Sequence, residues 1–136
     1  MEKLIAGLML VLAVTAPAGA ARKGGTKMGK MHVSSPAFAH GSSIPTVHTC
    51  DGRDASPPLD IGGVPEEAKS LVLIMDDPDA PVGTWVHWVV WNIPPGTGEI
   101  WESSLPPGSV EGRNSWKRNG YGGPCPPSGS HRYFFK

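Results

Sequence analysis

The chain has 136 residues, of which 12 are basic and 12 acidic, so its formal charge at pH 7 is zero. A chain of this length holds one domain at most, and it lacks the basic excess with which nucleic-acid-binding proteins attract phosphates. Its 18 glycines and 15 prolines are spread throughout and leave few positions for a helix of ordinary length.

The first twenty residues have the pattern of a secretory signal peptide. Lys3 gives a weakly positive start, residues 4–14 are almost entirely apolar, and Ala18-Gly19-Ala20 offers small residues to a signal peptidase. The apolar run is shorter than the roughly 20 residues of a transmembrane helix. An uncleaved anchor is the alternative, because Glu2 weakens the positive end. We expect cleavage after Ala20 and export to the periplasm or the medium.

The next segment, residues 21–37, predicts a flexible basic leader because it has almost no large apolar side chains. We therefore expect the folded domain over residues 38–136. The C-terminal segment of the chain, from Gly112 onward, has five basic residues and no acid. Such a segment can attract an anion or a membrane surface, but it is more often a solvated face that acidic residues elsewhere neutralise.

Two cysteines, Cys50 and Cys125, remain in a chain that we expect to be exported. An even number of cysteines in an oxidising compartment favours a disulfide. Two separate buried thiols are the alternative. Neither cysteine has the spacing of a zinc site, so no metal is predicted from them.

Short apolar runs rich in β-forming residues cover residues 70–75, 84–93 and 131–135, and Pro-Gly punctuation bounds them. This pattern predicts an all-β antiparallel sandwich with long Pro- and Gly-rich loops and few short helices. Residues 99–105 are compatible with one helical turn. Because residues 84–93 are apolar on both faces, this run reads as a central strand that is covered on both sides.

Polar residues interrupt these runs at three places. His87 lies within the strand predicted over residues 84–93, where strict alternation places it with Trp85 and opposite Trp88. A histidine in such a position is more often a satisfied core residue than a ligand contact. Asp77 follows the run at 70–75, and Pro78 holds its backbone extended. A solvated acidic turn is the simpler interpretation of that segment.

The third place is His131-Arg132-Tyr133 in the last run. On a strand, His131 and Tyr133 share one face and offer donors that suit an oxyanion of phosphate size, while Arg132 points away, toward an acid such as Asp79. The preceding glycines, including Gly123, allow close backbone approach to a ligand, and their N–H groups are candidates for an anion nest.

Burying a polar group without a partner costs roughly 2–7 kcal/mol. We therefore expect Asp77, His87, His131 and Tyr133 to satisfy one another around one small pocket. That convergence is the main functional prediction from the residues.

Five motifs occur in the order typical of one family. They are Thr49-Cys50-Asp51-Gly52, Ser56-Pro57-Pro58-Leu59, Asp76-Asp77-Pro78-Asp79-Ala80-Pro81, Val86-His87-Trp88-Val89-Val90, and Gly123-Pro124-Cys125-Pro126-Pro127 with His131-Arg132-Tyr133. Over residues 38–135 the chain resembles the phosphatidylethanolamine-binding protein family, in its bacterial Raf-kinase-inhibitor-like branch. The resemblance implies Greek-key sheets and one anion pocket of Asp77, His87, His131 and Tyr133, rimmed by Pro81, Trp85 and Gly123.

The chain departs from this family pattern in two ways. Asp60-Ile61 stands where bacterial relatives usually carry a tryptophan after Pro-Pro-Leu. Family members also continue beyond the position of Lys136 with further strand and a helix. We therefore expect a domain shortened at its C-terminus, with an open sheet edge and part of the pocket wall missing.

These observations predict a non-catalytic protein that binds a phosphate or phosphoryl-type anion, on a phospholipid head group or on a phosphorylated partner. Peripheral membrane contact fits that prediction, and the family name adds inhibition of a kinase or protease, for which the sequence identifies no partner. The first alternative is a hydrolase in which Asp77 and a histidine act as general base. The second is a metal site of Asp77, Asp79, His87 and His131. No cofactor and no nucleic-acid partner are predicted.

Overall fold

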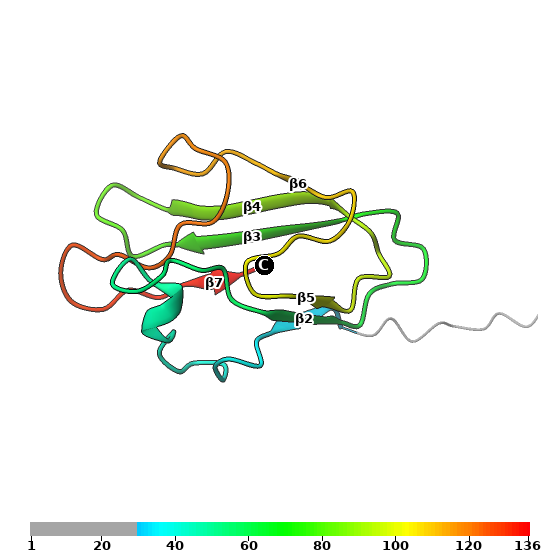
Figure 1. Cartoon of the computed structure of the whole chain (residues 1–136), viewed down its shortest axis with the longest axis horizontal. Coiled ribbons are helices and arrows are strands. Elements are labelled where there is room, and N and C mark those ends of the chain that lie inside the picture. The colour runs from blue at the N-terminus through cyan, green and yellow to red at the C-terminus, as the bar shows by residue number, and fades with distance from the viewer. Residues whose placement is uncertain (1–29) are drawn as a thin grey trace, which may run out of the picture.

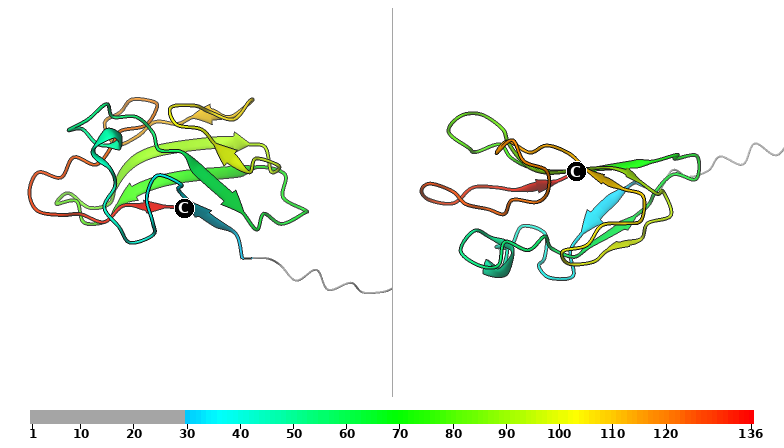
Figure 2. Two further views of the ribbon diagram at one scale, coloured as in Figure 1. Left: turned by 60° about the horizontal axis from the view of Figure 1, so that its bottom comes forward. Right: turned by 45° about the horizontal axis from the view of Figure 1, so that its top comes forward.

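Two antiparallel sheets face each other in the computed structural model of the chain, which describes residues 30–136 (Figure 1, Figure 2). The expected signal peptide and residues 21–29 of the expected leader lie outside the described residues. The smaller sheet has the order β1-β2-β5, with β1 His32–Ser34, β2 Leu59–Gly62 and β5 Glu99–Ile100. The larger sheet has the order β6-β4-β3-β7, with β6 Val110–Glu111, β4 Trp85–Ile93, β3 Leu71–Asp77 and β7 Phe134–Phe135.

The path of the chain confirms the predicted antiparallel β-sandwich. It passes from the smaller sheet to the larger one after β2, returns for β5, and crosses again to β6. Within the described part of the chain, only β3 and β4 form a direct hairpin. A single 3-10 turn, Thr46–His48, is the one helical element among residues 30–136, and no helix in this part of the chain is long and apolar enough to cross a membrane.

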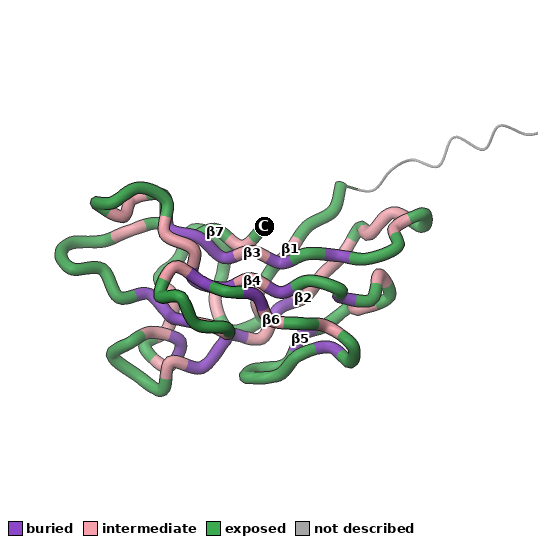
Figure 3. Tube along the Cα trace, turned by 90° about the horizontal axis from the view of Figure 1, so that it is seen from above, coloured by how far each residue is buried: buried purple, intermediate pink, exposed green. Residues whose placement is uncertain are grey.

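The core lies between the inner faces of the two sheets (Figure 3). Leu73 and Met75 of β3 and Trp88 of β4 meet Leu59 and Ile100 of the smaller sheet, and each of these five side chains is at most 3% exposed. Full burial of an apolar side chain of this size stabilises a fold by roughly 1.5–3 kcal/mol. These contacts fix the larger sheet against the smaller one and so hold the C-terminal end of β3 in place.

The structure differs from the predicted elements in three places. Residues 32–34, expected in a flexible leader, form β1 and pair with β2, so ordered structure begins before residue 38. Residues 99–100 are strand β5 rather than the start of a helical turn. Only the last two residues of the run at 131–135 pair as a strand, with Met75 and Asp76 of β3, and Lys136 after them exchanges backbone hydrogen bonds with Ile74.

The strand β4 is central in its sheet, as predicted, but it is not covered on both faces. Its inner side chains Trp88, Val90 and Ile93 are buried, whereas Trp91 on the outer face is 44% exposed. Apolar side chains on an outer face are therefore not by themselves a sign that another layer covers it.

Candidate functional site

A cavity of about 190 Å³ opens where β3 ends and β4 begins, beside the last segment of the chain. Its wall contains six of the seven side chains predicted for a site. The lining residues are Asp77, Ala80, Pro81, Val82, Trp85, His87, Trp116, Cys125, Pro126, Pro127, His131 and Tyr133. A wider neighbouring groove of about 760 Å³ shares Pro126, His131 and Tyr133 with it, but its other walls are mostly small polar and apolar residues. The small cavity is the candidate site.

A β-bulge in β4 positions His87. Met75 of β3 pairs with Trp88 of β4, but the next residue, Asp76, pairs with Val86. His87 is therefore an additional residue without a partner of its own in β3, which is the feature that defines a bulge. Bulges re-aim side chains and are frequent beside functional sites.

The bulge also changes which side chains of β4 share a face. Trp85 pairs with Asp77, and Trp88 pairs with Met75, and these two partners lie two residues apart on one face of β3. Trp85 and Trp88 therefore face the same side, three residues apart, whereas strict alternation predicted opposite sides. That prediction is wrong because one inserted residue reverses the alternation of a strand.

Asp77 accepts two hydrogen bonds at the end of β3. Its Oδ2 lies 2.7 Å from Nδ1 of His131, and its Oδ1 accepts the backbone N–H of Asp79 at 2.8 Å. The side chains of Asp77 and His131 are only 5% and 10% exposed. Pro78 stiffens the backbone between the two bonds, so the carboxylate is fixed rather than a solvated acidic turn.

His87 is held by the main chain of the glycine-rich loop. Its Nδ1 lies 2.6 Å from the carbonyl oxygen of Gly122, and the rings of Trp116 and Tyr133 meet it edge-on at centroid distances of 4.9 and 5.2 Å. Burial lowers the pKa of His87 below its usual value, although the Gly122 carbonyl and the charge of Asp77 oppose that shift. The ring is therefore neutral at pH 7, with its proton on Nδ1.

Tyr133 contributes its ring to the cavity wall, while its hydroxyl oxygen is buried and makes no well-aligned hydrogen bond among residues 30–136, with only the backbone N–H of Cys125 near it. Burial, and next the charge of Asp77, raise the pKa of Tyr133 to about 12, so the hydroxyl keeps its proton. A buried hydroxyl without a partner destabilises the fold.

We therefore expect Tyr133→Phe to raise the free energy of unfolding by about 1 kcal/mol, because it removes an unpaired buried hydroxyl and keeps the ring. Tyr121→Phe is the matched control, since the Tyr121 hydroxyl donates to the carbonyl of His48 at 2.7 Å and its removal breaks that bond. Urea denaturation of both variants measures the effect. A loss of stability in Tyr133→Phe as large as in Tyr121→Phe would contradict the assignment of an unpaired hydroxyl.

Gly123, predicted at the rim, lies behind the cavity wall instead. Its N–H donates to Oδ1 of Asp54 at 2.6 Å, and the N–H of Gly122 donates to the carbonyl of His87 at 3.0 Å. The amides of Gly122 and Gly123, two of those that the sequence offered for an anion nest, are thus occupied by the protein. The backbone of Asp54 has a φ of 56°, in the left-handed region that Asp tolerates better than most residues.

Arg132 points away from the cavity and pairs with Asp79, as the sequence predicted. Its Nη2 and Nε lie 2.7 and 2.9 Å from the two carboxylate oxygens, and its backbone N–H donates to Oδ2 at 2.8 Å. These hydrogen bonds hold the pKa of Asp79 well below its usual range. The guanidinium is therefore neutralised outside the site.

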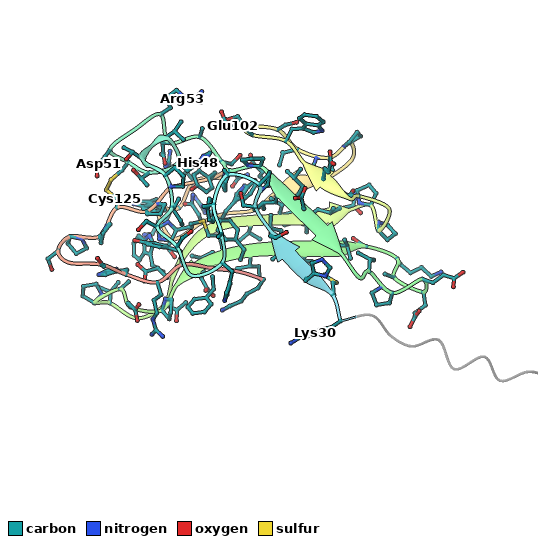
Figure 4. The ribbon with its side chains drawn as sticks, turned by 90° about the horizontal axis from the view of Figure 1, so that it is seen from below. Lys30, His48, Asp51, Arg53, Glu102 and Cys125 are labelled. Carbon is teal, nitrogen blue, oxygen red and sulfur yellow. A yellow bond between two sulfur atoms is a disulfide. The ribbon has the colours of Figure 1, made fainter. Side chains whose placement is uncertain are left out.

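A disulfide joins Cys50 to Cys125 and ties the loop after the 3-10 turn to the wall of the cavity (Figure 4). The N–H of Cys50 also donates to the carbonyl of Pro124 at 3.1 Å. Cys125 and the two prolines after it line the cavity. The cross-link therefore fixes the position of one wall.

Sequence reasoning missed Trp116, Asp54 and the two prolines Pro126 and Pro127. Trp116 belongs to a loop without a motif, and only its contacts with Trp85 and His87 identify it. Within residues 30–136 no three His, Cys, Asp or Glu side chains are placed to hold a metal ion. The site thus combines a carboxylate–imidazole pair, a neutral imidazole and an aromatic wall.

Comparison with known proteins identifies relatives of this fold and site. The family model for phosphatidylethanolamine-binding protein matches residues 34–136. A UPF0098 protein of Methanothermobacter thermautotrophicus is 53% identical over 111 residues, which cover 78% of this chain and 74% of that relative. A UPF0098 protein of Aquifex aeolicus is 54% identical over 112 residues, covering 78% of this chain and 66% of the relative.

Two solved structures share the fold. A proposed phosphatidylethanolamine-binding protein homologue from Chlamydia trachomatis superposes with a TM-score of 0.74 at 44% identity, over 77% of this chain and 71% of that one. YbcL of Escherichia coli, described as a member of the mammalian family, gives a TM-score of 0.73 at 37% identity, over 79% and 74% of the two chains. Some relatives are much longer, and the chain spans 40% of the one from Archaeoglobus fulgidus.

Proposed function

The chain belongs to the phosphatidylethanolamine-binding protein family, and from that premise we propose that it binds a phosphate or phosphoryl-type anion in the cavity formed by Asp77, His87, His131 and Tyr133 without turning it over. A volume of about 190 Å³ suits one small group of this kind. The anion belongs to a free metabolite, to a lipid head group or to a phosphorylated protein.

The hydrogen bond between Asp77 and His131 carries this proposal. A carboxylate with no partner beside the cavity would repel an anion, but here it accepts from Nδ1 of His131 at 2.7 Å. The other ring nitrogen, Nε2, is then the one available to a ligand. With Asp77 balancing the charge, His131 can carry protons on both nitrogens and donate one of them to an oxyanion.

The same pair supports a second candidate, a hydrolase in which Asp77 orients His131 as general base. Its nucleophile would be water, because the lining residues include no serine or threonine and Cys125 is in the disulfide. If an amide replaces the carboxylate in such a pair, it can donate to Nδ1 of the histidine, and the ring proton then lies on Nε2. Nε2 can no longer act as the base. A binding protein needs only the Nε2 donor, which that tautomer keeps.

Calorimetric titration of the purified chain with inorganic phosphate, together with a turnover assay on p-nitrophenyl phosphate, tests the proposal. We expect saturable binding with one site per chain and no turnover above buffer. Turnover by the unmodified chain that disappears in Asp77→Asn would support the hydrolase instead. Absence of any heat of binding with phosphate would refute the binding function.

We also propose that the chain is exported, since a disulfide persists in oxidising compartments and is rare in the cytosol. Fractionation of expressing cells tests this. Recovery of the protein only in the cytosolic fraction, with both thiols free, would exclude it.

A further inference from the structure

We propose that the cavity selects an oxyanion bearing a hydroxyl on its central atom, as inorganic phosphate and monoprotonated phosphate monoesters do, over sulfate and over phosphodiesters. This inference rests on the proposed anion-binding function and specifies the chemical class of its ligand. It follows from the two imidazoles of the site, which present opposite hydrogen-bonding roles to the cavity.

His87 presents an acceptor. The carbonyl oxygen of Gly122 can only accept a hydrogen bond, so the 2.6 Å contact requires the proton of the ring to be on Nδ1. In a neutral ring Nε2 then carries a lone pair and no proton. Among residues 30–136 no donor is bonded to Nε2, and Gly122 itself is fixed because its N–H donates back to the carbonyl of His87. The acceptor therefore needs a donor from the ligand.

His131 presents a donor. Its Nδ1 is bonded to the carboxylate of Asp77, which also only accepts, so Nδ1 carries a proton. An oxyanion oxygen at Nε2 requires a second proton between the two atoms. The resulting imidazolium lies between two negative groups, Asp77 and the anion, and each stabilises its charge.

The charges around the cavity favour a singly rather than doubly charged ligand. No lysine or arginine of residues 30–136 lines it, because Arg132 is bound to Asp79 on the outside. The ionisable groups that face His87 are Asp77 from β3 and Tyr133 from the last segment, with Asp54 behind the glycine loop. Asp77 and His131 together contribute no net charge, so nothing in the wall compensates a second negative charge.

A hydroxyl-bearing phosphoryl group satisfies both imidazoles at once. Its P–OH donates to Nε2 of His87, and one of its unprotonated oxygens accepts from Nε2 of His131. Sulfate at neutral pH and a phosphodiester have no such hydroxyl, so each would cover the lone pair on Nε2 of His87 and leave it without a hydrogen bond. An unpaired buried acceptor of this kind costs about a factor of ten or more in affinity.

Calorimetric titration of the purified chain at pH 6 with inorganic phosphate, sulfate and dimethyl phosphate tests the selection. We expect phosphate to bind at least about ten-fold more tightly than the other two. Phosphoethanolamine, a monoester, and glycerophosphoethanolamine, the diester found in a lipid head group, distinguish a soluble source from a lipid source, and we expect only the monoester to bind well. Equal affinity for phosphate and sulfate would overturn this inference and leave the anion-binding function intact, whereas no binding of any anion would overturn both.

His87→Asn provides a second readout. The asparagine amide can still donate to the Gly122 carbonyl, but it presents no ring acceptor to the cavity. We expect phosphate affinity to fall about ten-fold while sulfate affinity changes little, so that the ratio of the two approaches one. If His87 had only a structural role, the substitution would lower the affinity for both anions equally, and that result would contradict the proposal. If the variant does not fold, the ligand series on the unmodified chain decides.

Discussion

Removal of the disulfide between Cys50 and Cys125 is expected to lower the free energy of unfolding by about 4 kcal/mol. The two cysteines are 75 residues apart in sequence, so the cross-link closes a long loop in the unfolded chain and restricts it strongly. A domain of this size is stable by only about 5–15 kcal/mol in total. The loss is therefore a large fraction of the stability.

Thermal melts of the unmodified chain and of the double variant Cys50→Ala/Cys125→Ala measure this effect. Each kcal/mol corresponds to about 4–8 °C for a small domain, so we expect the midpoint to fall by at least about 15 °C. A reductant is the matched control, because it should lower the midpoint of the unmodified chain to that of the variant and leave the variant unchanged. Identical melts of the unmodified chain with and without reductant would contradict the prediction.

The two longest strands, β3 and β4, could be predicted because the pattern of their own residues is typical of a strand. The runs at residues 70–75 and 84–93 are apolar, β-branched and bounded by proline and glycine, and they correspond to β3 and β4. By contrast, β5 and β6 have two residues each and no pattern of their own. They are strands because Leu59 and Val90 provide partners, and tertiary context of this kind is invisible in local sequence.

The site was predictable where alternation is regular. Asp77 and His131 bond each other as expected, and Arg132 pairs with Asp79. Tyr133 lines the same cavity, but its hydroxyl bonds neither of them, contrary to the expectation that these groups satisfy one another. Alternation failed on β4, where the bulge at His87 depends on the register with β3 rather than on the residues alone.

The loops were the least predictable part of the site. Gly123 was expected to offer its N–H to a ligand, but Asp54 takes that hydrogen bond from 69 residues away in sequence. Trp116 comes to the wall from a loop that the side chain of Asn114 holds, by accepting the N–H of Trp116 at 3.0 Å and donating to the carbonyl of Gly120 at 2.9 Å. The sequence shows an asparagine there but not where the loop lies. Most of the polar side chains that line the cavity were therefore identified from sequence, whereas the groups that orient them required the structure.

His131→Ala is expected to have the largest effect on the site, because it leaves the carboxylate of Asp77 buried and without its hydrogen-bond partner. Leaving a buried carboxylate short of a hydrogen bond costs about 3 kcal/mol of stability. Anion binding is lost at the same time, since the Nε2 donor disappears and the remaining carboxylate repels the ligand. We expect phosphate affinity to fall about 100-fold, which corresponds to one charge-assisted hydrogen bond.

The double variant Asp77→Asn/His131→Ala separates these two causes. An asparagine carries no charge to desolvate, and its carbonyl can still accept the N–H of Asp79, so the double variant should be more stable than His131→Ala alone. The double variant should also bind phosphate more tightly than His131→Ala, because the charge of Asp77 no longer repels the anion. It should not reach the affinity of the unmodified chain, because the Nε2 donor of His131 is still missing. His32→Ala, on the edge strand β1 and remote from the cavity, is the control and should change neither quantity. If the double variant were no more stable than His131→Ala, the buried carboxylate of Asp77 would not depend on its hydrogen bond to His131. The pairing that underlies the proposed site would then be wrong.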